Sequence, residues 1–196
     1  MARLRVAAVL AALLLGTLDV RAQSPGELRL EDARHRLVIR VEPKGPGYLL
    51  WDGDGTPLGD LTIETDRVHL RDATGVVRWT IRRKDFGPQI ETATGERLYR
   101  MRKRPDEWRL EDATKVIVTR IHVRANGEAD IRDERGAATL TVKHVEHGFL
   151  FATETGHRVA EVAGPSRVAA GLWFGVERFS PAERAAMWAY FASLER

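Results

Sequence analysis

The sequence predicts a mainly β fold, in which an antiparallel meander of hairpins closes into a barrel near a hydrophobic C-terminal helix. Three observations lead to this prediction. A period of twenty residues runs through most of the chain, a turn signature recurs at one offset of that period, and an apolar stretch of helical character follows the last repeat.

The first 22 residues have the features of a secretory signal peptide. MARLR carries two arginines, VAAVLAALLLGTL (6–18) is an apolar or small-residue run, and Val20-Arg21-Ala22 offers small residues where a signal peptidase cleaves. The run is too short to span a bilayer as a stable helix. We therefore expect a single exported domain over 23–196, periplasmic or secreted. An uncleaved anchor and a misassigned start are the alternatives.

Charge and cysteine content exclude several classes of protein. The chain has 31 basic and 28 acidic side chains, and residues 1–22 contain three of the basic and one of the acidic ones, which leaves 28 against 27. A net charge of +1 is not typical of a nucleic-acid-binding protein. The chain has no cysteine, so it has neither disulfides nor thiol chemistry, and a lipoprotein anchor is excluded.

Seven units follow one another at a spacing of twenty residues, with one slip of a single residue between the fifth and sixth. A glycine marks most units, an Asp or Thr stands three positions before it, and an apolar residue stands five positions before it and six after it. The marker positions are His35, Gly55, Gly75, Gly95, Lys115, Gly136 and Gly156. The positions three before are Asp32, Asp52, Asp72, Thr92, Asp112, Asp133 and Thr153. The apolar columns are Leu30, Leu50, Leu70, Ile90, Leu110, Ile131 and Phe151, and then Val41, Leu61, Ile81, Met101, Ile121, Val142 and Val162.

Each unit reads as a β-hairpin. The Asp or Thr side chain can hydrogen-bond the turn backbone, and glycine provides the positive φ at which the chain reverses. Alternation places one face of each strand inward. His35 and Lys115 lack the glycine, so we expect those two turns to be looser or bulged. Seven hairpins joined by short connections make more strands than one open sheet accommodates, and closure removes the exposed edges.

The chain changes character after Gly164-Pro165. The stretch 166–179 places small residues around Leu172, Trp173 and Phe174, and the whole segment 166–194 is predicted to be largely helical. Gly171 and Gly175 would each cost a helix about 1 kcal/mol unless close packing requires them. The alternative is that 166–179 forms a last strand and only 180–194 is helical.

A second helix start follows at Ser180-Pro181-Ala182-Glu183. Serine is a preferred N-cap, proline is tolerated in the first turn, and the glutamate three residues on completes a capping box. ERAAMWAYFASL then continues as a helix with few charges.

The unit at 68–84, VHLRDATGVVRWTIRRK, resembles the LURP-one-related proteins of the tubby-like and scramblase-like barrel group. The shared pattern is an apolar strand, Asp72-x-x-Gly75, a second strand through Ile81 and a basic end, Arg82-Arg83-Lys84. The next unit, ETATGERLYRMRKR, is similar in layout. The resemblance covers most of 28–179 in layout and 68–104 in residue detail.

This resemblance implies a barrel of roughly twelve strands closed around a hydrophobic helix, which it places at 166–179. For function it implies little. Tubby-like domains bind phosphoinositides, but no residue of that site can be matched here. Scramblase-like members carry lipidated cysteines and a calcium-binding segment, and this sequence shows neither.

A cluster of basic residues is the main functional lead. We take as candidates for binding an anionic surface Arg78, Arg82, Arg83, Lys84, Arg100, Arg102, Lys103, Arg104 and Arg124. Strands that follow a turn glycine all run in one direction, so their ends, with Lys44, Lys84, Arg104 and Arg124, should gather at one rim of the barrel. Such a basic rim, opposite an aspartate-bearing rim, could dock on phospholipid or lipopolysaccharide head groups. The alternative is a solvated charged surface, partly neutralised by Asp66, Asp85, Asp106 and Glu107.

Other chemistry has weaker support in the sequence. His144 and His147, with His157 nearby, stand at a spacing that places the first two on opposite faces of a strand. Asp52-Gly-Asp54-Gly55 has the start of a calcium loop, but Leu61 replaces the required glutamate. None of the four serines lies in a nucleophile elbow. We expect no metal, no cofactor and no enzymatic activity.

The sequence therefore favours an exported, non-enzymatic binding module that docks on an anionic envelope surface through a basic rim. The alternative is a structural or protein-interaction component of the envelope. In that case the outer barrel face or the apolar helix, with Met187, Trp188, Tyr190 and Phe191, would contact a partner protein. A small-molecule carrier requires a hollow barrel, which the inward Trp79, Trp108 and a threaded helix disfavour.

Overall fold

Fourteen strands and three helical segments make up the fold. A computed structural model describes residues 26–164 and 168–194, and the predicted leader at 1–22 lies outside the described residues. The strands are β1 Leu28–Asp32, β2 Leu37–Lys44, β3 Gly47–Asp52, β4 Pro57–Ile63, β5 Arg67–Asp72, β6 Val77–Arg82, β7 Gln89–Thr92, β8 Arg97–Lys103, β9 Glu107–Asp112, β10 Ile117–Val123, β11 Ala129–Arg132, β12 Ala138–Val145, β13 Gly148–Ala152 and β14 Arg158–Ala163. The helical segments are α1 Val168–Gly171, the 3₁₀ helix η1 Leu172–Gly175, and α2 Pro181–Ser193.

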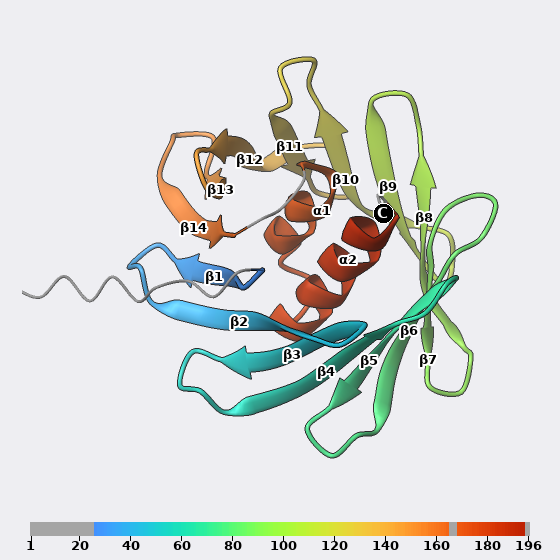
Figure 1. Cartoon of the computed structure of the whole chain (residues 1–196). Coiled ribbons are helices and arrows are strands. Elements are labelled where there is room, and N and C mark those ends of the chain that lie inside the picture. The colour runs from blue at the N-terminus through green and yellow to red at the C-terminus, as the bar shows by residue number, and fades with distance from the viewer. Residues whose placement is uncertain (1–25, 165–167, 195–196) are drawn as a thin grey trace, which may run out of the picture.

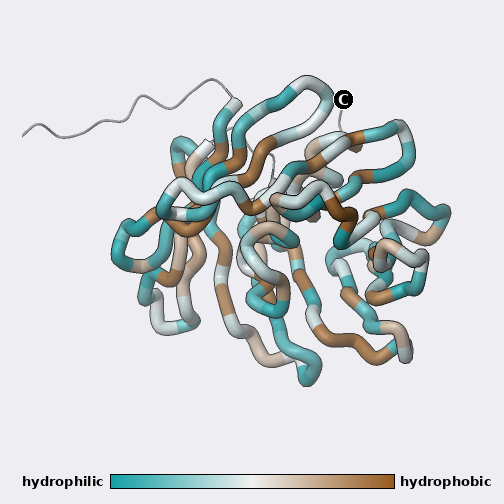
Figure 2. The backbone as a smooth tube through the Cα atoms, turned by 90° about the horizontal axis from the view of Figure 1, so that it is seen from below, coloured by the Kyte–Doolittle hydropathy of each residue, from teal (hydrophilic) through white to brown (hydrophobic). Residues whose placement is uncertain are grey.

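The strands form one closed antiparallel barrel. Each pairs with its neighbours in sequence, and β1 pairs with β14 through Arg29↔Ala163 to Asp32↔Ala160, which closes the ring (Figure 1). Figure 2 shows hydrophobic and hydrophilic residues alternating along the strands, while most hairpin tips are hydrophilic. The predicted fold class is confirmed. The number of strands is fourteen rather than roughly twelve, because each of the seven units contributes two.

All seven signature turns have the same geometry. In each, the backbone N–H of the marker residue donates to the carbonyl of the Asp or Thr three positions before it, as in Gly75 to Asp72 at 2.9 Å. A register shift accompanies every one of these hairpins, which is the pattern of a type I turn followed by a bulge. The bulge expected at the turns of His35 and Lys115 is present, but the other five turns have it as well. These two turns are not otherwise different, since both residues adopt a positive φ, 59° and 72°.

We expect Lys115→Gly to stabilise the protein by roughly 0.5–1 kcal/mol, because relief of the left-handed strain exceeds the entropy that glycine adds to the unfolded chain. Chemical denaturation measures the change. The reciprocal substitution Gly95→Lys, at a turn where a side chain would meet no other atom within 4 Å, should destabilise by a similar amount. A Lys115→Gly protein less stable than the parent would contradict this account.

The turn aspartates carry out a structural role. Oδ1 of Asp72 accepts from the backbone N–H of Thr74 at 2.9 Å and of Val76 at 3.1 Å, and the aspartates at the equivalent positions of four other units do the same. The hydrogen bond from the Thr74 hydroxyl is the largest of the effects that lower the pKa of Asp72 from 3.8 to about 2. These carboxylates therefore stabilise the turns through their hydrogen bonds.

A pH series on Asp72→Asn tests this role. Because the folded pKa lies below that of an unfolded aspartate, the ionised group stabilises the fold above about pH 4, and this contribution is lost as the pH falls toward about 2. We expect the wild type to exceed the variant in melting temperature at pH 6, and the difference to shrink toward pH 2. In Asp54→Asn, whose carboxylate makes no hydrogen bond among the described residues, no such pH-dependent difference should appear.

The helical segments fill the barrel. α2 crosses the interior, with α1 and η1 beside it (Figure 1). Residues 168–175 form two short helical pieces, so the alternative of a last strand at 166–179 is wrong for these residues, and the longest helix inside is α2 rather than the segment named by the resemblance. Two glycines make this packing possible. A Cβ on Gly171 would lie 2.2 Å from the ring of Phe149, and one on Gly175 would lie 2.3 Å from Ile131 Cδ1.

α2 begins as predicted. The Ser180 backbone N–H donates to Glu183 Oε2 at 2.8 Å, the Glu183 N–H donates to Ser180 Oγ, and Pro181 opens the first turn. Inside the barrel, aromatic rings join the helix to the strands: Trp188 lies edge-on to Tyr48 at 4.9 Å and Phe191 to Trp108 at 5.2 Å. Among the described residues, no helix is long and apolar enough to cross a membrane.

Candidate functional site

The seven signature turns lie at one rim of the barrel and the remaining connections lie at the other, as the meander requires. We call these the aspartate rim and the opposite rim. The opposite rim is not uniformly basic. Glu64, Asp66, Asp106 and Glu146 share its connections with the predicted cations. The predicted basic rim is therefore narrower than the sequence indicated, and the candidate arginines and lysines fall into four groups.

Arg78 does not belong to the opposite rim. It stands near the start of β6, at the aspartate rim, and its Nε lies 2.7 Å from Oδ2 of Asp72. Its position in the sequence, four residues before Arg82, places it about one strand length away from the other candidates.

Arg82, Arg100 and Arg102 lie on the outer wall and pair with carboxylates of neighbouring strands. Arg82 faces Glu91 at 3.4 Å, while Arg100 and Arg102 face Glu111 at 2.5 and 3.6 Å. Both glutamates are buried beneath these guanidinium groups. Arg100 hydrogen-bonds Glu111, whereas Arg82 and Arg102 lie at ion-pair distance from their glutamates without a hydrogen bond from Nε within the described part of the chain. All three arginines therefore neutralise carboxylates of the barrel wall.

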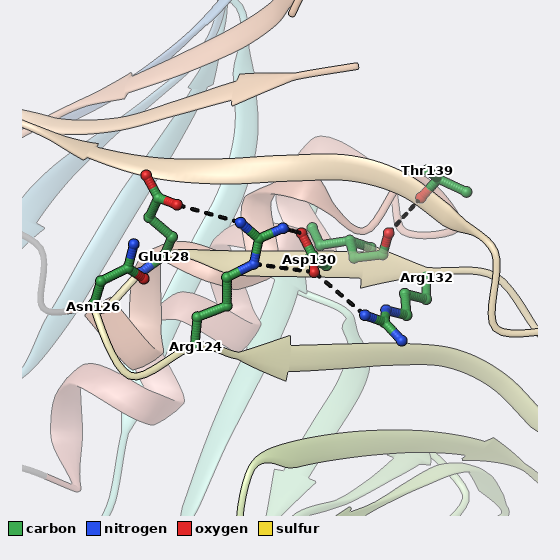
Figure 3. A network of polar contacts seen from close by, with 7 residues as sticks. Arg124, Asn126, Glu128, Asp130, Arg132 and Thr139 are labelled. Carbon is green, nitrogen blue, oxygen red and sulfur yellow. Dashed lines mark hydrogen bonds and ion pairs between the residues drawn. The ribbon is translucent and has the colours of Figure 1, made fainter. Parts of the chain in front are cut away.

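Arg124 reaches the opposite rim but is held by carboxylates (Figure 3). Its NH2 lies 2.5 Å from Oδ1 of the buried Asp130, its Nε lies 3.2 Å from Oδ2, and Glu128 approaches from the other side at 3.4 Å. Arg132 contacts the same aspartate at 3.4 Å. This network fixes the turn between β10 and β11, so Arg124 has a structural role.

The other four candidates, Arg83, Lys84, Lys103 and Arg104, come together at the opposite rim. We call them the basic corner. Arg83 and Lys84 open the β6–β7 connection, and Lys103 and Arg104 lie at the β8–β9 turn. Among the described residues, no carboxylate lies within ion-pair distance of these four side chains. The amine of Lys103 lies 5.6 Å from the ring centre of Trp108, a cation–π distance.

A cavity of about 560 Å³ opens at the basic corner, at the mouth of the barrel. Arg83, Lys84 and Lys103 line it, together with Phe86, Trp108, Tyr190 of α2 and Leu194, the C-cap of that helix. Its volume is within the range of small-molecule sites. Of its two carboxylates, Asp66 is engaged by Arg67 at 2.8 Å, which leaves Asp85 against three cations.

The site predicted from the sequence did not include two aromatic residues of this cavity, Phe86 and Tyr190. Phe86 is 48% exposed, although most large apolar side chains of the barrel are buried. Burial raises the pKa of Tyr190, and the nearby positive charge of Arg83 opposes part of that effect. The sequence signal for Phe86 was an aromatic residue directly before Gly87-Pro88, within a predicted loop. The position of Tyr190 depended on the packing of α2.

The histidines and the Asp52–Gly55 stretch have structural environments. His144 lies edge-on to Phe149 at 5.3 Å, and His147 is exposed in the β12–β13 turn. Asp52 accepts hydrogen bonds within its own turn. Within 26–164 and 168–194, no group of three or more His, Asp or Glu side chains is placed to hold a metal ion.

The apolar helix is not available to a partner protein. Met187, Trp188, Tyr190 and Phe191 are all at most 3% exposed, because the barrel closes around α2. The prediction that this helix could serve as an interaction surface was wrong. The packing also explains why α2 has four large apolar or aromatic side chains and few charges, since these side chains fill the interior of the barrel.

The comparisons with known proteins do not identify a function for this chain. No family model matches the chain, and no curated protein matches it in sequence. Among solved structures, the crystal structure of a protein from Arabidopsis thaliana covers 90% of this chain and 96% of its own, at 12% identity and a TM-score of 0.40. A domain named for outer membrane lipoprotein sorting, from Vibrio parahaemolyticus, covers 70% and 80%, at 17% identity and a TM-score of 0.28.

Proposed function

We propose that this chain is an exported, non-enzymatic binding module that docks on an anionic phospholipid surface through the basic corner. The observation that supports this proposal most strongly is a contrast in pairing. The outer arginines pair with carboxylates, whereas the four cations of the corner have no carboxylate within ion-pair distance among the described residues. Each cation held near an anionic membrane surface contributes about 1 kcal/mol to binding.

Phe86 adds an apolar contact to this electrostatic attraction. It lies between Asp85 and Gly87 in the β6–β7 connection and is half-exposed. Aromatic side chains are favoured at the level of lipid head groups, where one end meets hydrocarbon and the other meets water. A loop that combines Arg83, Lys84 and Phe86 is suited to contact that interface.

Sedimentation of residues 23–196 with vesicles tests the proposal. We expect binding to vesicles of phosphatidylglycerol, weak binding to phosphatidylcholine, and a decline as the salt concentration rises from about 0.05 to about 0.5 M. Lipopolysaccharide micelles form a separate arm that distinguishes the source of the anionic groups. Equal binding to neutral vesicles, or binding insensitive to salt, would contradict docking through the corner.

A further inference from the structure

A second cavity, of about 300 Å³, adjoins the first at the basic corner. The two share Lys103 and Trp108, which therefore lie between them. The second cavity is lined by residues 103–107 of the β8–β9 turn and by Trp108, Val123 and Leu172, the last from the helical segment inside the barrel.

The chemistry of the two cavities differs. The first is bordered by the cations Arg83, Lys84 and Lys103, whereas the second combines a charged side, formed by residues 103–107, with the apolar Trp108, Val123 and Leu172. Two carboxylates, Asp106 and Glu107, also line the second cavity, and arginines of the outer wall neutralise Glu107. Glu107 binds Arg109 and lies 3.3 Å from Arg120 on the outer wall, and Asp106 lies 3.5 Å from His122. Positive charge beside an apolar pocket is the complement of an anionic amphiphile.

We infer that the two cavities form one site for a single-chain anionic amphiphile. Its phosphate or carboxylate head lies between Arg83 and Lys103, and its hydrocarbon tail lies against Trp108, Val123 and Leu172. Each methylene removed from water contributes up to about 0.8 kcal/mol. The closed barrel remains filled by α2, so the ligand is held at the mouth and not in the interior.

This inference rests on the proposed function, because the same corner would contact the lipid surface. It goes further by giving the corner a ligand that is a single molecule with a defined stoichiometry. A module that docks by charge alone needs no apolar cavity behind its cations. Docking on vesicles and binding of a single amphiphile can therefore be tested separately.

Isothermal titration of residues 23–196 with alkyl phosphates, below their aggregation concentrations, tests the inference. We expect dodecyl phosphate to bind with a stoichiometry near one and at least about tenfold more tightly than butyl phosphate, since its longer tail buries more methylenes. Inorganic phosphate, as the head group alone, should bind more weakly than either. Dodecyl phosphate should also raise the melting temperature, as a ligand specific to the folded state does.

Variants separate the two halves of the site. Val123→Trp should fill the second cavity and remove the dependence on chain length while leaving vesicle binding intact. Val123→Thr serves if Val123→Trp does not fold, because threonine is similar to valine in volume. We expect it to weaken the binding of dodecyl phosphate but not of butyl phosphate. Arg83→Gln should weaken all the phosphates.

Three results would overturn the inference. They are equal affinities for dodecyl and butyl phosphate, equal binding of dodecyltrimethylammonium, or a stoichiometry of many molecules per protein. If vesicle binding persists in any of these cases, the docking function stands and only the amphiphile site fails. If vesicle binding is absent but dodecyl phosphate binds once and with chain-length dependence, the docking function fails instead.

Discussion

Replacing Phe191 with alanine is expected to lower the free energy of unfolding by about 3–5 kcal/mol, the range for large buried aromatic side chains. Phe191 is 3% exposed and joins three parts of the fold. Its ring stacks on Trp173 of η1 at 5.3 Å and lies edge-on to Trp108 of β9 at 5.2 Å. Truncation would remove both contacts and leave a cavity between α2 and the wall.

Phe86→Ala is the matched control, because it makes the same chemical change at an exposed position. We expect it to change stability by less than about 0.5 kcal/mol, as for other surface sites, and to weaken binding to anionic vesicles. Denaturant unfolding followed by tryptophan fluorescence measures both variants. Equal stability losses would contradict the assignment of one phenylalanine to the interior and the other to the surface.

The double substitution Arg83→Gln/Lys103→Gln is expected to weaken binding to anionic vesicles by roughly 30-fold. This estimate takes about 1 kcal/mol for each cation near the membrane and a tenfold change for each 1.4 kcal/mol. Both residues line the cavity at the mouth, and neither pairs with a carboxylate among the described residues. Their removal should therefore affect binding far more than stability.

Arg82→Gln/Arg102→Gln provides the matched control. It removes the same charge from neighbouring positions, but these side chains lie on the outer wall against Glu91 and Glu111. We expect vesicle binding within about threefold of the wild type, because the glutamates already balance these two charges, and a loss of stability instead. Equal loss of binding in both double variants would indicate a diffuse electrostatic effect and not a docking corner.

Much of the fold could be predicted because its information is periodic. The column from Leu30 to Phe151 and the column from Val41 to Val162 alternate as strands do, and the structure places both columns inside the barrel. Closure followed from the number of strands. The turns at His35 and Lys115 could not be predicted in the same way. The surrounding strand pairing holds these residues at positive φ, and that tertiary constraint outweighs their local preference.

The candidate site was harder to predict because neighbouring residues in a strand point in opposite directions. Arg82 and Arg83 are adjacent in sequence, yet Arg82 lies on the outer wall with Glu91 while Arg83 borders the mouth near Tyr190. Charge counting along the chain cannot separate the two. The carboxylates that engage Arg100 and Arg124 come from the next strands, so their pairing depended on the register of the barrel.

The orientation of the protein on the membrane tests the central claim most directly. Because the chain has no cysteine, Asp85→Cys and Val76→Cys each create a single labelling site, the first beside Phe86 at the basic corner and the second exposed at the aspartate rim. With an environment-sensitive fluorophore on each, phosphatidylglycerol vesicles should shift the emission of the label at 85 to the blue and leave the label at 76 unchanged. A shift at 76 alone, equal shifts at both positions, or no shift at either would contradict docking through the basic corner.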